Sequence, residues 1–177
     1  SIADSTEPRL VGSDATRGWS YGIWASGLAQ ETFVGCHWEG LQIYDTRNTS
    51  SPVRDTFLLG CDQSVDIYID DGKAYVANEM AGLKILDISD PTRPKTLGSY
   101  DTTWQRPFIS SVIARDSFAF VDWWDRPSLR VLDVADPEQP IAVGGCDVTN
   151  TPQDMVIRDS FVYVAEVARF QVVNVAR

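Results

Sequence analysis

One sequence unit occurs four times along the chain, and this repeat constrains the fold more than any other feature. Its clearest copy runs from Gly82 to Pro94 (GLKILDISDPTRP), and related copies run from Gly40 to Pro52 and from Ser128 to Pro140. A shortened copy, Arg169 to Ala176, lies near the end of the sequence. Such a chain is expected to fold as similar units that bury their apolar faces against one another.

Each unit reads as four short strands, named a to d, with turn residues between them. In the second unit, strand a is expected at 66–69, strand b at 73–77, strand c at 83–88 and strand d at 95–100. Alternating apolar residues of β-branched and aromatic types favour strands, and the Gly, Asp and Pro residues between them favour hairpins. No segment shows an apolar stripe of helical period, so we predict essentially no helix.

The spacing of equivalent residues predicts the fold class. The strand b aromatics Phe33, Tyr75, Phe120 and Tyr163 follow one another at intervals of 42, 45 and 43 residues. A period near 43 with four strands per unit is typical of β-propeller blades. We therefore predict a single all-β domain, a propeller with four blades of four antiparallel strands. Its units lie at about 14–60, 61–101, 102–146 and 147–177, the last joined by 1–13.

The two ends of the chain are expected to complete one blade between them. Residues 8–13 read as a strand d without its own a, b and c, whereas the last unit has a, b and c without a strand d. In the simplest closed ring, the N-terminal strand completes the last blade and hides two open strand edges. The alternative is a partial ring of a larger propeller, either a piece of a longer array or a half that dimerises.

Charge and cysteine spacing exclude several classes of function. The net charge of −10 and the pI near 4.4 argue against a nucleic-acid partner, because such binding needs Lys and Arg to neutralise phosphates. No apolar run approaches the roughly 18 residues of a membrane-spanning helix, so no membrane span is predicted. The three cysteines show no CxxC spacing, which disfavours a zinc or redox site. If a disulfide forms, Cys36 and Cys61 are the preferred pair, since they belong to one blade and one rim.

The repeat resembles a known family. The segments GLKILDISDPTRPKTLGSYDT and SLRVLDVADPEQPIAVGG are similar to LVIVD repeats, which occur in bacterial and archaeal proteins that are often secreted or displayed on the cell surface. The resemblance covers essentially the whole chain and is strongest from Val65 to Val143. It implies a β-propeller and an extracellular or cell-surface location, and it transfers no catalytic residues. Four blades are fewer than the family's usual arrays contain.

One rim of the predicted propeller collects aromatic and charged residues, because the b–c loops and the d-to-a crossovers share it. Exposed aromatics beside carboxylates and arginines are typical of binding patches, and the same mixture would suit a sugar ring stacked on tryptophan. The alternative is that these tryptophans cap the blade core. The residues assigned to the patch are Trp38, Glu79, Trp104, Arg106, Asp122, Trp123, Trp124 and Arg126.

Two aspartates are expected at the mouth of the central channel. Asp66 and Asp154 hold the same strand a position in units two and four, which face each other in a four-blade ring. Carboxylate oxygens suit Ca²⁺ or another hard cation, so a structural cation is the one cofactor considered for this site. Alternatively, each aspartate bonds the backbone of the neighbouring blade.

Enzyme chemistry is weakly indicated. His37 is the only histidine and no nucleophile motif lies near it, so we assign no catalytic residues. We expect a non-catalytic extracellular binding or scaffold module that recognises a protein or glycan partner within an oligomer or larger assembly. The alternative is an extracellular hydrolase or lyase with a carboxylate or metal site at the channel mouth.

Overall fold

The computed structural model describes residues 9–25, 30–58, 60–61, 63–101, 108–124 and 126–176. All regular elements of these residues are β-strands. Within this part of the chain there is accordingly no helix of the length and apolar character needed to cross a membrane. The all-β class predicted from the repeat is confirmed.

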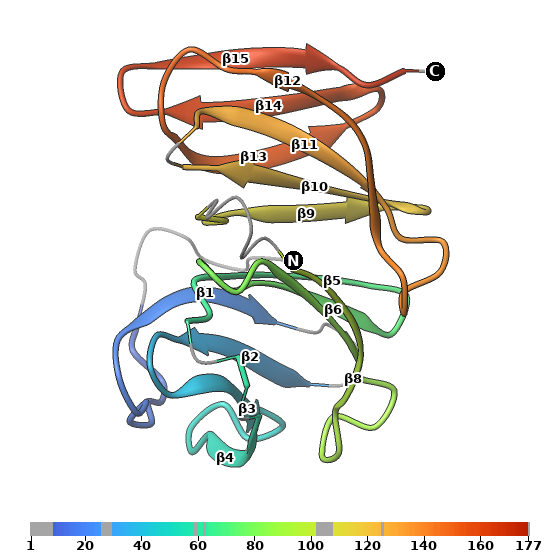
Figure 1. The fold of residues 1–177 in the computed structure, drawn as a ribbon. Coiled ribbons are helices and arrows are strands. Elements are labelled where there is room, and N and C mark those ends of the chain that lie inside the picture. Colours follow the sequence, from blue (N-terminus) through green and yellow to red (C-terminus); the bar gives the residue numbers. More distant parts are fainter. Residues whose placement is uncertain are drawn as a thin grey trace.

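Four antiparallel sheets follow one another along the chain, and each is one blade of a β-propeller (Figure 1). Blade one contains β1 (Ser20–Ala25), β2 (Glu31–Cys36), β3 (Gly40–Asp45) and β4 (Val53–Leu58). Blade two contains β5 (Asp66–Asp70), β6 (Lys73–Ala77), β7 (Leu83–Asp87) and β8 (Lys95–Tyr100). Blade three contains β9 (Val112–Arg115), β10 (Phe118–Trp123), β11 (Ser128–Asp133) and β12 (Ile141–Asp147). Blade four contains β13 (Pro152–Arg158), β14 (Phe161–Glu166) and β15 (Arg169–Asn174).

The turns within the blades follow from the repeated residue types. At the a–b hairpins, Asp71, Asp116 and Asp159 adopt φ values of 44°, 55° and 52°, a left-handed conformation that aspartate tolerates. At the c–d turns, Asp87 Oδ1 accepts the Ser89 N–H at 2.9 Å. The same bond recurs at the corresponding position of every blade, so the repeated Asp or Asn after strand c shapes the turn.

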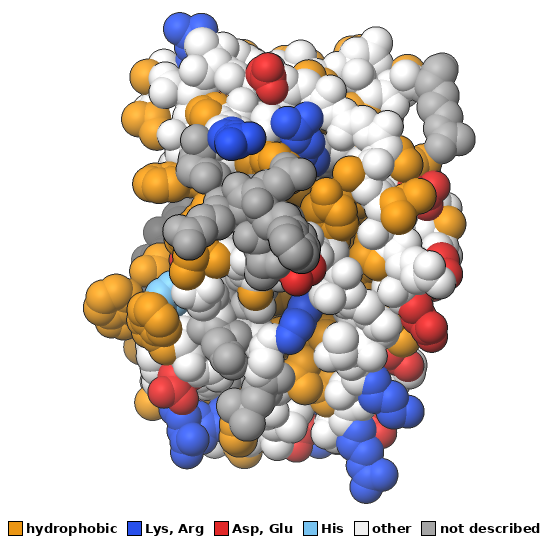
Figure 2. Space-filling model, in the orientation of Figure 1, with side chains coloured by type: hydrophobic (Ala, Val, Ile, Leu, Met, Phe, Trp, Pro, Cys, Tyr) orange, Lys and Arg blue, Asp and Glu red, His pale blue; other side chains and the backbone are white. Residues whose placement is uncertain are grey.

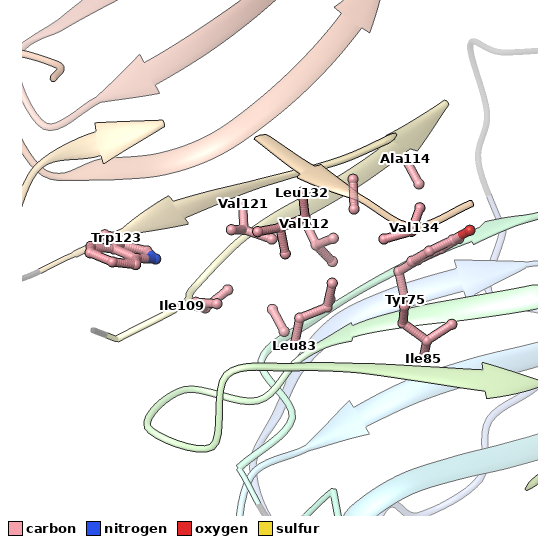
Figure 3. Packing of buried hydrophobic residues seen from close by; sticks show 12 residues of the cluster. Tyr75, Leu83, Ile85, Ile109, Val112, Ala114, Val121, Trp123, Leu132 and Val134 are labelled. Carbon is pink, nitrogen blue, oxygen red and sulfur yellow. The ribbon is translucent and has the colours of Figure 1, made fainter. Parts of the chain in front are cut away.

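The core lies between consecutive blades. Three apolar clusters join blade one to two, two to three and three to four, and Figure 3 shows the middle one. Strand c residues such as Ile43 and Ile85 are fully buried there, each contributing roughly 1.5–3 kcal/mol by leaving water. Among the described residues, no cluster joins blade four to blade one. Stability therefore comes from contacts between successive blades, as in other repeat proteins.

The N-terminal segment departs from its predicted place. Blade four is a sheet of three strands, and residues 9–13, the described part of the expected fourth strand, do not belong to it. They lie against blade one instead, where a Cβ added at Gly12 would overlap the Thr49 carbonyl oxygen. The following residues continue over the same blade, with the Arg17 N–H donating to Gln42 Oε1 at 3.2 Å. The predicted closure of the last blade by its own N-terminal strand is thus not seen.

The predicted Cys36–Cys61 disulfide is also not present. Cys36 packs with Val34 and Tyr44 on one side of blade one, whereas Cys61 belongs to the cluster between blades one and two. The two thiols therefore lie on opposite faces of one sheet. Sharing a blade and a rim did not place them together, because Cys36 in β2 points away from blade two, whereas Cys61 in the loop after β4 packs toward it.

Candidate functional site

The four b–c turns lie on one rim of the propeller, and each presents an exposed apolar side chain. We call residues 37–39, 78–81, 124, 126–127 and 167–168 the b–c rim. The exposed side chains are Trp38, Met80, Trp124 and Val167, with exposed fractions between 49% for Trp124 and 69% for Val167. Figure 2 shows hydrophobic side chains that project from the surface beside the single histidine. One such residue from every blade creates an apolar ring of a kind that marks interaction sites.

The backbone of the first turn holds Trp38 outward. Trp38 adopts a φ of 64°, and Gly40 two residues later adopts 77°. A left-handed backbone is common for glycine but unfavourable for a bulky residue, at a cost of order 1 kcal/mol. A tryptophan that is 66% exposed in such a conformation buries little area in return. This residue is therefore better explained by a role on the surface than by a role in folding.

A polar side-chain contact joins the first two turns of the rim. His37 Nε2 lies 3.1 Å from Glu79 Oε2, and both side chains are largely buried. The imidazole contacts the rings of Tyr21 and Trp38 edge-on, with centroids 5.8 and 4.2 Å apart. The main chain helps as well, since the His37 N–H donates to the Trp19 carbonyl at 3.0 Å. The only histidine thus supports the rim by linking blade one to blade two.

A cavity of about 480 Å³ opens where the innermost strands of the four blades converge. Its wall includes the aromatic rings of Tyr21 and Trp124 and the carboxylates of Asp66, Glu79 and Asp154. The rim and the channel mouth are therefore one continuous surface, with apolar tips around an acidic hollow. Such a hollow suits a ligand with a cationic or hydroxyl-bearing group.

The Asp66 carboxylate connects blade two to blade three by hydrogen bonds. Its Oδ2 accepts the Val112 N–H at 2.9 Å and lies 3.1 Å from the Ser111 hydroxyl, while its Oδ1 accepts the Ile67 N–H at 2.8 Å. Burial raises the pKa of the Asp66 carboxyl, and the nearby carboxylate of Asp154 acts in the same direction. These contacts match the alternative that the aspartate bonds the neighbouring blade.

Asp154 shares the strand position of Asp66 but not its partners across blades. Its Oδ1 accepts the N–H of Met155 at 2.8 Å, and the residue is exposed at the cavity. In the part of the chain that the structure describes, no three His, Cys, Asp or Glu side chains are grouped to hold a metal ion. The cation site at Asp66 and Asp154 stays a prediction.

Two residues assigned to the binding patch lie in the interior. Asp122 is fully buried and accepts hydrogen bonds from the N–H groups of Ser110 and Ser111 and from the Ser110 hydroxyl, at 2.6–2.8 Å. Trp123 belongs to the cluster between blades two and three (Figure 3), and the Arg130 guanidinium lies 4.8 Å from its ring centre. Burial raises the pKa of Asp122 to about 6. Neither side chain is placed to touch a partner, so Trp123 follows the alternative of a tryptophan that caps the core.

The other assigned residues divide into three groups. Trp38 and Trp124 are exposed on the rim, and Glu79 supports it from below. Arg126 is exposed beside a separate hollow of about 430 Å³ that Trp123 and Arg130 also line. Trp104 and Arg106 lie outside the described residues.

Sequence reasoning missed several members of the rim surface. Tyr21, Met80 and Val167 were not assigned to the patch. Tyr21 precedes Gly22, the strand a position of blade one that corresponds to Asp66, so this alignment could have placed it at the channel mouth. Val167 carried no signal beyond its place in a b–c turn.

Comparison with known proteins identifies the repeat. The family described as LVIVD repeat matches positions 63–102, which contain all of blade two. Residues 63–102 are thus similar to the LVIVD repeat family. The resemblance predicted from the sequence is thereby confirmed for these residues. Blades one and three share the four-strand order of blade two, and blade four has the first three strands of that order. A comparison with curated proteins gives no match.

Solved structures similar to this chain share its propeller fold at low sequence identity. The computationally designed Ika4 protein is 11% identical, with a TM-score of 0.72 over 97% of this chain and 100% of Ika4. A functionally unknown protein from Desulfotomaculum acetoxidans is 16% identical, with a TM-score of 0.73 over 97% of this chain and 56% of that one. The periplasmic gluconolactonase PpgL of Pseudomonas aeruginosa is 17% identical, with a TM-score of 0.71 over 95% of this chain and 52% of that one. The chain thus spans about half the length of these two natural proteins, and the likeness concerns the fold alone.

Proposed function

We propose that this protein is a non-catalytic extracellular binding or scaffold module that docks a partner protein through its b–c rim. The observation that carries the proposal is the set of exposed apolar side chains, one in each b–c turn, around a shared acidic hollow. Apolar tips spread over four blades resemble a protein interface more than a sugar subsite, because a partner protein can contact them all at once. A glycan stacked on Trp38 or Trp124 is the other form of the same proposal.

A substitution at Trp38 tests this role outside the apolar clusters, because the ring is 66% exposed and its ring contact is with His37. Trp38→Gly deletes the exposed ring and relieves the left-handed backbone, so the fold should be at least as stable as before. Labelled protein added to intact source cells is expected to bind their surface, and Trp38→Gly should weaken this binding at least tenfold. Val53→Ser is the matched control, since Val53 is 60% exposed, similar to Trp38, but follows a c–d turn on the opposite rim.

Treatment of the cells separates the two kinds of partner. Loss of binding after mild proteolysis of the cell surface supports a protein partner, whereas loss after periodate oxidation supports a glycan. Binding that Trp38→Gly and Val53→Ser leave equally strong would overturn the rim as the docking surface. The same would hold if neither the wild-type protein nor any variant bound the cells.

A hydrolase or lyase at the channel mouth is a second candidate, because three carboxylates line one cavity there. Asp154 is the group to test, since it is exposed and Asp66 is committed to the next blade. Turnover of a panel of lactones and polysaccharides by the wild-type protein, lost in Asp154→Asn, would support this candidate. Retained turnover in Asp154→Asn, or none in either protein, would remove it.

A further inference from the structure

The face of blade four that points away from blade three is apolar but uncovered. Phe170 and Val172 on β15 are 71% and 49% exposed. The corresponding residues of blade two, Leu83 and Ile85, are fully buried because blade three covers them. Blade four therefore carries the residues of a blade-to-blade contact without the blade that would cover them.

On the face of blade one that points away from blade two, Val34, Cys36 and Tyr44 are buried, but the innermost strand is uncovered. Ile23 on β1 is 68% exposed. The corresponding residues of the next three blades, Ile67, Val112 and Met155, are at most 6% exposed, because each packs against the preceding blade. Among the described residues, no blade therefore covers Ile23 of blade one, just as none covers Phe170 and Val172 of blade four.

The N-terminal segment already occupies the position of one strand of a blade that would cover blade one. A Cβ added at Gly98, in strand d of blade two, would overlap the carbonyl oxygen of Pro137 in the c–d turn of blade three. Gly12 holds the corresponding strand d position, and it meets Thr49 at the corresponding place in the c–d turn of blade one. Residues 9–13 therefore lie on blade one as a strand d would, while β15 is the last strand of a three-stranded sheet.

A polar contact fits the same pattern. The Asp66 carboxylate of blade two accepts the backbone N–H of Val112 in blade three. The corresponding pair across the missing contact is Asp154 of blade four and Ile23 of blade one. Asp154 is exposed and reaches no neighbouring blade among its described hydrogen bonds.

We propose that two copies of this chain close into one ring, in which residues 9–13 of each copy pair with β15 of the other. The apolar face of blade four then packs on blade one of the second copy, and Asp154 bonds the backbone at Ile23. A second copy fits better than closure within one chain, because blades four and one of the described chain share no apolar cluster. The similar natural propellers of about twice this length are consistent with a ring of two such halves.

Cysteine cross-linking tests which chain supplies the missing strand. Blade two pairs Lys84 with Ser99, and the corresponding positions are Gln171 on β15 and Ser13. Ser13→Cys and Gln171→Cys are introduced into separate, co-expressed chains, only one of which is tagged, with Cys146→Ser in both. Mild oxidation should link the tagged chain to the untagged one, at twice the 19.7 kDa mass of a single chain.

The control replaces Gln171→Cys by Glu138→Cys, a position in the c–d turn of blade three that should give no link between chains. A chain that carries both Ser13→Cys and Gln171→Cys distinguishes the rival closure. If only this double variant forms a disulfide, and within one chain, the ring closes on itself and the proposal is overturned. If no disulfide forms in either format, the proposed strand pairing is absent and the proposal fails as well.

A second measurement needs no new cysteine. Val172→Asp places a charge on the uncovered face of blade four, where it is solvated in the single chain but buried in the proposed ring. Light scattering after gel filtration should show a dimer for the wild-type protein and at least tenfold weaker association for Val172→Asp. Ile141→Asp, at a similarly exposed apolar position on β12, should associate like wild type. A wild-type protein that stays monomeric at all concentrations would overturn the proposal.

Discussion

At the scale of single residues, the buried carboxyl of Asp122 makes the stability of the protein depend on pH. Its pKa is raised to about 6 in the folded state, mainly by burial. The folded protein therefore binds a proton more tightly than the unfolded chain, and the free energy of unfolding should rise as the pH falls from 7 toward 4. The gain from this group is at most about 3 kcal/mol, at 1.36 kcal/mol for each pKa unit.

Asp122→Asn isolates this effect. The replacement keeps an acceptor for the N–H groups of Ser110 and Ser111 and can donate to the Ser110 hydroxyl. Urea unfolding at several pH values should show a shallower pH dependence in the variant between pH 4 and 7. Some dependence should remain, because burial also raises the pKa of Asp66. An unchanged slope would show that Asp122 does not titrate in this range.

Trp123 and Trp124 show how far residue-level prediction could reach. Adjacent residues at the end of a strand point to opposite sides, so the two tryptophan rings are expected to differ in burial. Strand b expected at 73–77 in the second unit corresponds to 118–122 in the third, whereas β10 continues to Trp123 and that ring packs in the core. One residue of strand length decided which tryptophan is available to a partner, and no local pattern specified it.

At the scale of the strand, a glycine in strand d sets how closely successive blades approach. Gly98→Ala would place a methyl group against the Pro137 carbonyl oxygen, which is part of the backbone and cannot easily move. We therefore expect the free energy of unfolding to fall by about 1–3 kcal/mol. The corresponding Gly144 has no atom within 4 Å of an added Cβ. Gly144→Ala should therefore be neutral within about 0.5 kcal/mol or slightly stabilising. Equal losses in the two variants, measured by urea unfolding, would contradict this view of blade spacing.

The strands themselves could be predicted because each unit repeats the same signals. Alternation in strand c and the Asp-Gly or Asp-Ser hairpins located the strands of blades two and three, and the period gave the blade count. The place of the N-terminal strand could not be obtained this way. Its sequence indicates a strand d. It does not specify whether this strand pairs with β15 of its own chain or with β15 of another chain, since the same pairing can form in either way.

At the scale of the whole molecule, cohesion comes from contacts between successive blades, so the end blades should be the least stable. Blades two and three are each packed on both faces, whereas Phe170 and Val172 leave one face of blade four open. In hydrogen exchange of the dilute protein, amides of β6 and β10 should be the most protected and those of β15 the least. Raising the protein concentration should protect β15 selectively, because pairing with a second chain covers its edge. Equal protection of all four blades at every concentration would instead indicate one cooperative ring already closed within the chain.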